Sequence, residues 1–226
     1  MSVQVNQMFS DISGKYDLLN NIFTFGLHKK WKKELIEISS SQHGDKIIDI
    51  ACGTGDISLL FSEQKCDVTA LDFSQNMLDV LEKRAKSLSV NINIIRGDAL
   101  NIPLENNFFD LATIGYGIRN VDDPKKCLKE MARLVKKDGK VLILETGQAK
   151  GIIGIINKIY SNYIMPTLGN LFAGNYSAYK YLSDTAESFP YGKDFTQMME
   201  ETNLFENIEM KKLFFGVSYI YSARVK

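Results

Sequence analysis

Two carboxylates and two glycines meet in the stretch DIACGTGD, which lies between two apolar runs. At Gly53 and Gly55 the backbone can approach a ligand closely, because a Cβ atom there would collide with it. The flanking Asp49 and Asp56 would repel a pyrophosphate but attract a ligand with a cationic amino group and a sulfonium. A dinucleotide fingerprint needs a third glycine where this chain has Ser58, and the G-x-x-x-x-G-K-[ST] phosphate loop is absent. The pattern therefore favours S-adenosylmethionine.

Carboxylates also end the next two apolar runs. Asp72 follows the second run, where a carboxylate can accept both hydroxyls of a ribose, and Asp98 ends the third run in RGDA. In an open α/β sheet, ligands bind beyond the carboxyl ends of the strands, so these acids are expected at one rim with the adenine near Asp98 and Ala99. Each acid taken singly could instead be a helix cap or a solvated turn.

The elements that must position these residues alternate along the chain. Short β-rich runs are predicted strands: Lys46–Ala51, Asp67–Phe73, Ile92–Asp98, Phe109–Tyr116 and Lys140–Thr146. Between them, ISLLFSEQ, SQNMLDVLEKRAKSL and PKKCLKEMARLVKK have helical spacing. Ser74 is expected to cap the second of these helices, and Pro124 and Gly139 to mark the start and end of the third. This alternation predicts a parallel sheet covered on both faces.

The alternation ends after Thr146. Residues 147–190 are rich in apolar and aromatic side chains without a clear strand, which predicts a helical insertion and not a linker. A helix over Asp194–Asn203 and two β-rich runs, Asn207–Phe215 and Val217–Arg224, follow. The two runs are separated by Gly216 and are expected to form an antiparallel hairpin at the sheet edge.

Composition narrows the functional classes. Lys plus Arg and Asp plus Glu both number 27, so no net field attracts nucleic acid. The 3 cysteines are scattered and have no histidine partners at metal-ligand spacing, so we expect reduced thiols and no metal. The start of the chain lacks the pattern of a signal peptide, and no run of apolar residues is long enough to span a membrane. We therefore expect a cytoplasmic protein.

Four motifs, DIACGTGD, LDFS, GDALNIP and FDLATIGYGIRNV, resemble those of class I S-adenosylmethionine-dependent methyltransferases. More narrowly, MFSDISGKYDLLNNIFTFGLHKKWKK, GIRNVDD and IMPTLGNLFAGNYSAYKYLSDTAESFP resemble the C-methyltransferases of ubiquinone and menaquinone biosynthesis over nearly the whole chain. The resemblance implies methylation of a ring carbon of a polyprenylated quinol. It leaves benzoquinol and naphthoquinol acceptors open, since members of both kinds share these motifs, and the lack of a targeting peptide slightly favours demethylmenaquinol. The resemblance also suggests a homodimer.

The same resemblance implies a Rossmann-like α/β fold, with a seven-stranded, mostly parallel sheet, a C-terminal antiparallel hairpin and a helical insertion or lid. We expect one methyltransferase domain over residues 1–226. Its parts would be an N-terminal helical lid (1–40), a cofactor-binding core (45–146), a helical substrate insertion (147–190) and a C-terminal helix and hairpin (191–226).

Carried over by position, the resemblance implies cofactor contacts at Thr54, Asp72, Asp98 and Ala99, and at Gly115, where the family often has serine. Together with the glycine turn, the predicted cofactor-binding residues are Asp49, Gly53, Thr54, Gly55, Asp72, Phe73, Asp98, Ala99 and Gly115.

Methylation of a ring carbon needs a quinol whose hydroxyl has lost its proton. We predict that Arg119 and Asn120 face that oxygen, with Tyr16 and Asp17 arriving from the N-terminal lid. The guanidinium of Arg119 stays charged and would lower the pKa of the quinol, with an ordered water taking the proton. As an alternative, Arg119 forms a structural ion pair with one of the two aspartates that follow it in RNVDD.

An isoprenoid tail needs an apolar exit from the site. Ile152–Ile164 and the tyrosines 176, 179 and 181 are candidates for that channel, the alternative being a satellite core under the lid. In HKKWKKELIEI, Trp31, Leu35 and Ile38 share one helix face among lysines. Such a helix can rest on an anionic bilayer, which would place the protein peripherally at the inner face of the cytoplasmic membrane, although a solvated charged face is the commoner meaning.

Three other functions stay open on the sequence. A methyltransferase of this fold could act on a phenol oxygen or an amine. A non-catalytic S-adenosylmethionine-binding scaffold in a biosynthetic complex would carry the same turn. An NAD oxidoreductase is the third alternative.

Overall fold

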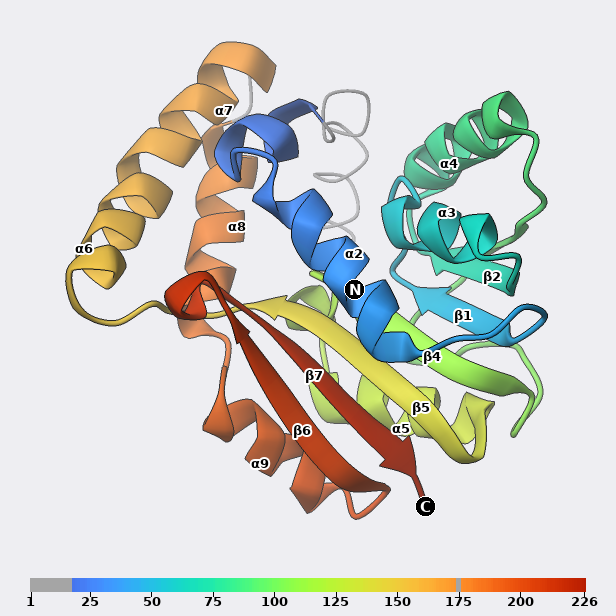
Figure 1. The fold of residues 1–226 in the computed structure, drawn as a ribbon. Helices are drawn as coiled ribbons and strands as arrows, with labels where there is room; N and C mark the ends of the chain where they lie inside the picture. Colours follow the sequence, from blue (N-terminus) through green and yellow to red (C-terminus); the bar gives the residue numbers. More distant parts are fainter. Residues whose placement is uncertain (1–17, 174–175) are drawn as a thin grey trace.

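A single seven-stranded sheet forms the centre of the molecule (Figure 1). The structure is a computed structural model and describes residues 18–173 and 176–226. The strands are β1 (Lys46–Ile50), β2 (Asp67–Asp72), β3 (Asn93–Arg96), β4 (Phe109–Gly115), β5 (Val135–Thr146), β6 (Phe205–Leu213) and β7 (Ser218–Val225), in the order β3-β2-β1-β4-β5-β7-β6. The first five are parallel, whereas β7 runs antiparallel to both β5 and β6. The predicted parallel sheet with a C-terminal hairpin at its edge is confirmed.

Helices cover both faces of this sheet and bury two separate cores. One core lies under α2 (Leu27–Ser39), α3 (Asp56–Glu63) and α4 (Gln75–Leu88), and it includes Trp31 and Phe61. The other lies under α5 (Pro124–Leu134) and α9 (Lys193–Glu201), with Phe195 fully buried. Strands that are covered on both faces have near-continuous apolar sequences, which is why IIDI and VLILE could be predicted as strands.

Helix starts follow the capping residues. The Ser74 hydroxyl accepts a hydrogen bond from the backbone N–H of Met77 at 3.4 Å, as predicted for the start of α4. Asp123 caps α5 by accepting from the N–H of Lys126 at 3.0 Å, with Pro124 in the first turn. Both caps satisfy backbone donors that have no partner inside the helix.

Two predicted boundaries are wrong. The helix expected to continue through Lys137 ends at Leu134, because Val135 pairs with Phe109 and begins β5. Gly139 therefore lies within β5 and does not terminate the helix. β3 is shorter than expected: it ends at Arg96, and Asp98 instead forms an isolated antiparallel bridge with Asn101 across a turn.

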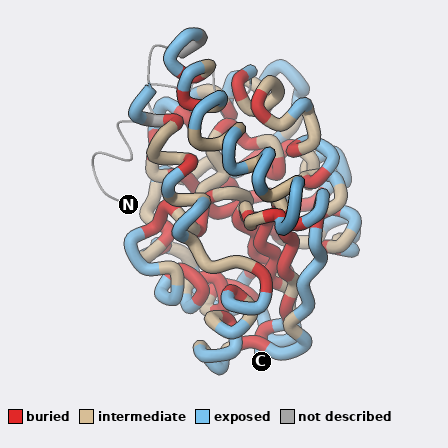
Figure 2. Tube along the Cα trace, turned by 90° about the vertical axis from the view of Figure 1, so that its left-hand side faces the viewer, coloured by how far each residue is buried: buried red, intermediate tan, exposed pale blue. Residues whose placement is uncertain are grey.

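The insertion forms a helical layer beyond the carboxyl ends of the parallel strands. It consists of α6 (Gly151–Ile159), a π-helical turn (Tyr160–Ile164), α7 (Met165–Ala173) and α8 (Tyr176–Ser188), so the predicted helical insertion is confirmed. Residues 18–23 are also helical and pack against it. Phe23 and Tyr179 meet edge to face, with ring centroids 5.1 Å apart, in a small core of their own. Most residues of this layer are exposed or half-buried (Figure 2).

The turn from β1 into α3 depends on its glycines. Gly53 and Gly55 have φ angles of 56° and 85°, a region that residues with a Cβ enter at a cost. A Cβ on Gly55 would lie 2.1 Å from Cδ1 of Leu81, whereas a Cβ on Gly53 would meet nothing within 4 Å. Gly55 is therefore required for packing of the turn on α4, and Gly53 faces open space.

Replacing Gly55 by Ala should destabilise the protein by about 2–4 kcal/mol, because left-handed strain adds to a clash with the buried Leu81. Gly44→Ala is the matched control, since Gly44 has a φ of 86° but a Cβ there would meet nothing within 4 Å. It should cost about 1–2 kcal/mol. Urea unfolding of the wild type and both variants measures the two losses, and equal losses would contradict the packing role.

Candidate functional site

A cavity of about 400 Å³ lies at the carboxyl ends of the strands, between the sheet and the helical insertion. Its floor is the glycine turn after β1 and the end of β4. Its walls come from residues 20–32 and from the insertion, and Phe214 and Val217 close one side. This volume is in the range of sites for small organic ligands.

Asp49 supplies a buried carboxyl group to this cavity. Its side chain is 1% exposed; Oδ2 accepts a hydrogen bond from the Ser58 hydroxyl at 2.5 Å, and Oδ1 has no hydrogen-bond partner among the described residues. Burial raises the pKa of Asp49 to about 7, against the opposing hydrogen bond from Ser58. An orphaned carboxylate oxygen on a residue that lines a cavity suits a cationic donor such as an ammonium group.

Asp56 differs from what the sequence indicated. Its carboxylate is held by Lys32 Nζ and Arg84 Nη2, each at 2.7 Å. Burial alone would raise the pKa of Asp56, but the two cations outweigh it and hold the pKa well below its usual range. The expectation that both acids of DIACGTGD attract a cationic ligand is therefore wrong for Asp56, and the attraction rests on Asp49.

Asp72 links the ends of β1 and β2. One carboxylate oxygen accepts from the N–H of Gly53 and the other from the N–H of Ser74, both at 2.8 Å, and burial raises its pKa. Each oxygen keeps a further lone pair that can accept a ribose hydroxyl. Thr54 is buried beside it and lines the cavity.

The remaining cofactor candidates surround this turn. Asp98 accepts from the N–H of Leu100 at 3.0 Å, and Ala99 packs in the core under α5. Phe73, Asp98 and Ala99 follow β2 and β3, next to Asp72 but outside the cavity lining. Gly115 lines the cavity, and a Cβ there would lie 2.4 Å from Cδ1 of Ile57, so a serine at this position would displace Ile57.

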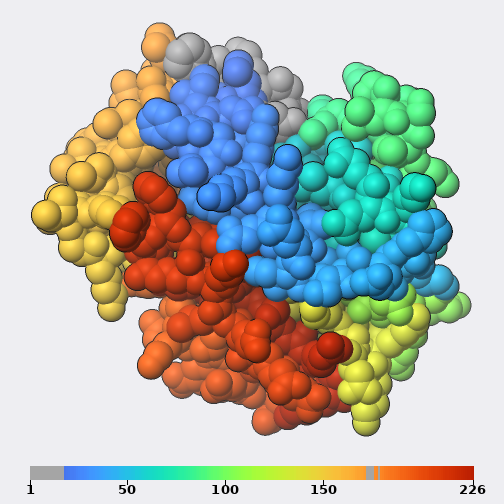
Figure 3. All heavy atoms as spheres, viewed as in Figure 1, coloured from blue at the N-terminus to red at the C-terminus, as the bar shows by residue number. Residues whose placement is uncertain are grey.

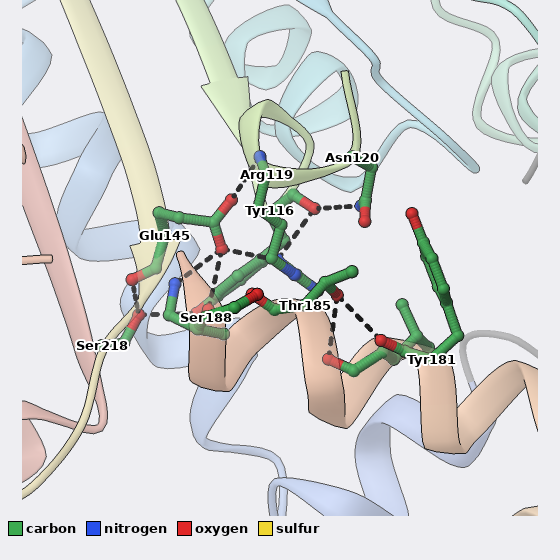
Figure 4. Close-up of polar contacts among 10 residues, drawn as sticks. Tyr116, Arg119, Asn120, Glu145, Tyr181, Thr185, Ser188 and Ser218 are labelled. Carbon is green, nitrogen blue, oxygen red and sulfur yellow. Dashed lines mark hydrogen bonds and ion pairs between the residues drawn. The ribbon is translucent and has the colours of Figure 1, made fainter. Parts of the chain in front are cut away.

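Arg119 forms a buried ion pair with Glu145, the last residue but one of β5 (Figure 4). Nη1 donates to Glu145 Oε1 at 2.5 Å and to the Tyr116 carbonyl at 3.0 Å. The side chains of Arg119 and Glu145 are 8% and 1% exposed. Within the described residues, Nε of Arg119 has no hydrogen-bond partner, and the residue lines the cavity. Arg119 is thus paired with Glu145 and not with an aspartate that follows it in the sequence. Its Nε–H remains as a donor for a ligand.

The other predicted catalytic residues are Asn120, Tyr16 and Asp17. Asn120 is 5% exposed and donates to the Tyr116 carbonyl at 3.3 Å, but it is not part of the cavity lining. Its Oδ1 is buried and lacks a partner among the residues that the structure describes. Tyr16 and Asp17 lie outside the described residues.

One histidine lines the cavity without having been expected there. His28 Nδ1 lies 2.6 Å from the Thr24 hydroxyl, and the residue is 4% exposed. Burial and the neighbouring Lys32 lower its pKa to about 4, so the ring is neutral at neutral pH. Because an isolated histidine carries no spacing signal, the sequence could not assign it.

Some of the residues predicted for the tail channel line the cavity, and one also belongs to a small core. Ile153, Ile156 and Tyr160 line the cavity, whereas Tyr179 belongs both to the lining and to the small core with Phe23. In α2, however, Trp31 and Leu35 are buried in the core against the sheet. The proposed membrane face of that helix is therefore an internal packing face.

Sequence comparison with known proteins assigns the chain to a family. A sequence model of the ubiE/COQ5 methyltransferase family matches residues 1–224. A demethylmenaquinone methyltransferase of Bacillus cereus is 39% identical over 224 residues, which cover 96% of this chain and 94% of the relative. A protein of the same name from Bacillus cytotoxicus has the same identity and coverage. The chain belongs to the ubiE/COQ5 methyltransferase family. The predicted resemblance is confirmed, and the protein is an enzyme of the methyltransferase class.

Solved structures agree on the fold. A SAM-dependent methyltransferase from Thermotoga maritima aligns with a TM-score of 0.71 at 18% identity, covering 98% of this chain and 100% of that one. Phosphoethanolamine N-methyltransferase 2 of Haemonchus contortus, in complex with S-adenosyl-L-methionine, aligns with a TM-score of 0.65 at 16% identity, covering 87% of this chain and 52% of that one. At such identities the likeness concerns the fold, and the predicted Rossmann-like methyltransferase architecture is confirmed.

Sequence reasoning missed two neighbours of Arg119. Glu145 ends the apolar run VLILE, and the rule that selected Asp72 and Asp98, an acid at the carboxyl end of a strand, would have found it. Tyr116 contributes through its carbonyl, and its hydroxyl lies 3.1 Å from that of Ser218. A backbone acceptor leaves no signal in the identity of a residue.

The high pKa of Asp49 should appear in the stability of the protein. The unfolded chain has the ordinary value of 3.8, so between pH 4 and about 7 the folded protein holds a proton that the unfolded chain has released. Stability from this group is present below pH 4 and is lost as the pH rises through about 7. Asp49→Asn should therefore gain stability relative to the wild type over that window, by a few kcal/mol at about 1.4 kcal/mol per pKa unit.

Urea unfolding from pH 4 to 8 measures this difference, and Asp110→Asn is the control whose pH dependence lies outside this window. Burial alone would raise the pKa of Asp110, but hydrogen bonds from the Lys136 ammonium and the Lys46 N–H outweigh it and leave the pKa below its ordinary value. The contribution of Asp110 is present above its unfolded pKa of 3.8 and is lost as the pH falls below 4, so between pH 4 and 8 the curve of Asp110→Asn should stay parallel to that of the wild type. Parallel curves for the wild type and Asp49→Asn would contradict the assignment.

Proposed function

We propose that this methyltransferase moves a methyl group from S-adenosylmethionine to a ring carbon of a polyprenylated quinol, with demethylmenaquinol as the acceptor. One observation carries the proposal: a single cavity is lined by a buried carboxylate with an orphaned oxygen, Asp49, and by a buried guanidinium with an orphaned donor, Arg119. The first complements a cationic methyl donor and the second an anionic acceptor. The names of the relatives support the choice of acceptor.

The residues at the strand ends fit the methyl donor. When bound, S-adenosylmethionine supplies an electrophilic methyl group on a sulfonium. Asp49 would accept from its ammonium group, and Asp72 from its ribose hydroxyls. Gly53 leaves open space above the turn for the ligand. Phe73, Asp98 and Ala99, which follow β2 and β3 beside Asp72, would flank the adenine.

Arg119 would hold the acceptor oxygen. Its Nε–H points to no acceptor within the described residues and can donate to the phenolate-like oxygen of the quinol. This favours the deprotonated quinol, which is electron-rich at the adjacent ring carbon. Fixed donors in a water-poor pocket stabilise such an oxyanion without reorganising. The new bond between the ring carbon and the methyl group would replace the bond from that methyl group to sulfur, and the ring carbon would then release its proton to water.

Glu145 would act as a positioning residue. It binds Nη1 of Arg119, and its Oε1 also accepts from the N–H of Thr146 at 2.6 Å and from the Thr146 hydroxyl at 3.1 Å. These bonds fix the carboxylate at the end of β5. Because one edge of the guanidinium is held there, its Nε–H keeps one direction relative to the cavity.

The acceptor's tail would leave between the insertion and residues 20–28. Ile153, Ile156 and Tyr160 give that side of the cavity an apolar surface. A quinol with a long isoprenoid tail resides in a bilayer, so the enzyme would work at a membrane surface.

The proposal is tested by calorimetry with S-adenosylhomocysteine and by a methylation assay with a short-chain demethylmenaquinol, product mass being the readout. Arg119→Ala should lower kcat by roughly 100-fold, the usual effect of removing one oxyanion donor, and leave S-adenosylhomocysteine affinity nearly unchanged. Arg119→Lys is the charge-conserving control. Binding without methylation of any quinol would contradict the acceptor, and a joint loss of binding and turnover would place Arg119 in the cofactor site.

Glu145→Gln should lower kcat more than it changes KM for the quinol, because the guanidinium loses its fixed direction. It should also destabilise the fold by about 3–5 kcal/mol, the cost of a buried charge left alone. The double variant Arg119→Leu with Glu145→Leu separates these effects. Its stability should recover while turnover stays lost. Recovery of both in the double variant would contradict the positioning role.

A further inference from the structure

Helix α6 shows its apolar side to solvent. Ile152, Ile155, Ile156 and Ile159 are 77%, 63%, 61% and 51% exposed, and no residue of α6 is buried. Their spacing of three, four and seven residues puts them on one stripe of the helix. A surface helix ordinarily turns such a stripe toward the core, whereas α6 turns it toward solvent. No helix within the described residues is long and apolar enough to cross a membrane.

Exposed aromatic side chains extend this stripe around the mouth of the cavity. Phe25 is 83% exposed and its ring centroid lies 6.3 Å from that of Tyr160, while Phe214 and Phe215 are 50% and 61% exposed at the β6–β7 turn. We call this surface the apolar rim, and it comprises Phe25, Ile152, Ile155, Ile156, Ile159, Tyr163, Phe214 and Phe215. In Figure 3 the three contributing segments, residues 18–26, α6 and the β6–β7 turn, adjoin on one face.

The rim is continuous with the cavity, because Phe25, Ile156 and Phe214 belong to both. The backbone is also held in an unfavourable state to display the aromatics. Phe25, Phe214 and Phe215 have φ angles of 49°, 36° and 58°, a region that bulky residues rarely enter. Packing does not account for this, since all three side chains are at least half exposed. Strain of this kind is typical of ligand-binding and functional segments.

Charge around the rim is positive. Residues 147–183 contain three lysines and no aspartate or glutamate, but Lys158 pairs with Glu187 and Lys180 with Asp184, so among the described residues Lys150 is the lysine of this stretch that keeps its charge uncompensated. Exposed lysines adjoin each segment of the rim: Lys29 and Lys30 follow Phe25, Lys150 precedes α6, and Lys212 precedes the β6–β7 turn. An apolar stripe with flanking lysines is the arrangement of helices that lie in the headgroup region of an anionic bilayer.

We propose that the apolar rim inserts into the surface of an anionic lipid bilayer and places the mouth of the cavity against the acyl chains. This inference rests on the proposed function, because it explains how a bilayer-resident tail reaches the site. A second copy of the chain fits the surface less well. It would bring two sets of lysines together and would cover the mouth of the cavity.

Co-sedimentation of the full chain with vesicles tests the rim. The wild type should bind phosphatidylglycerol-containing vesicles, and the double variant Ile152→Gln with Ile159→Gln should bind at least roughly tenfold less, since both apolar side chains are lost from the interface. Leu88→Gln is the matched control, because Leu88 is 54% exposed on α4, away from the rim. Neither Ile152 nor Ile159 lines the cavity, so turnover of a short-chain quinol in solution should be unchanged in the double variant.

The depth to which the apolar rim enters the bilayer is measured with tryptophan side chains introduced as fluorescent reporters. The native Trp31 is 6% exposed and also lines the cavity, so its quenching in the wild type is measured first and subtracted as the background. Ile155→Trp should be quenched by brominated lipids, whereas Leu88→Trp should not. Equal quenching at the two positions, or wild-type binding that Ile152→Gln with Ile159→Gln leaves unchanged, would overturn the proposal.

Two further outcomes are separable. If the wild type is a dimer and the double variant a monomer with vesicle binding unchanged, a second copy covers the rim and the proposal is wrong. If the wild type binds vesicles through the rim but does not methylate the short-chain quinol, the rim stands and the proposed acceptor fails. If the short-chain quinol is methylated and no vesicle is bound, the rim proposal alone fails.

Discussion

The structure depends on charges that are buried at the carboxyl edge of the sheet without full compensation. A buried ion is costly unless it is paired or hydrogen-bonded, and Asp49 meets that condition with only one of its oxygens. Its raised pKa is the physical consequence of that deficit. Arg119 is the converse case, since Glu145 neutralises its charge but leaves one donor unused. A cavity between such groups favours a ligand that carries both missing partners.

Sheet order brings these groups together. β1 and β4 are neighbours, and Asp49 is in register with Thr113, whose buried hydroxyl also lacks a partner among the described residues. β5 lies on the other side of β4, with Gly115 in register with Leu144, so Glu145 follows directly beside the turn that carries Arg119. Because parallel strands end at one edge, residues far apart in sequence reach one cavity without a long loop. The helical insertion then covers the cavity on the side opposite the glycine turn.

The sequence alone predicted most of this frame, for identifiable reasons. Acids after β1 and β2 were found because a strand-end carboxylate has a clear pattern, and the hairpin because its runs alternate around Gly216. What escaped depends on partners from other elements. The neutralisation of Asp56 requires Lys32 on α2 and Arg84 on α4, and no local pattern shows that these three meet. The early end of α5 likewise follows from a tertiary pairing, Val135 with Phe109, that overrides helical spacing.

Amphipathic pattern was the least reliable guide to which side of a helix is buried. For α2 the alternatives were a membrane face and a solvated charged face, yet its apolar face is internal; for Ile152–Ile164 they were a channel and a satellite core, yet four isoleucines of α6 face solvent. Periodicity fixes that a helix has an apolar face but not what lies against it. For α6 the choice follows from its two other sides. Ile153 lines the cavity, Gly154 lines a second pocket together with Ser183 and Ala186 of α8, and Lys158 pairs with Glu187 of α8. The stripe of isoleucines that faces solvent is the remaining side of the helix. Because this stripe is continuous with the mouth of the cavity, the apolar tail of the proposed substrate would leave the cavity where the protein exposes its apolar side chains.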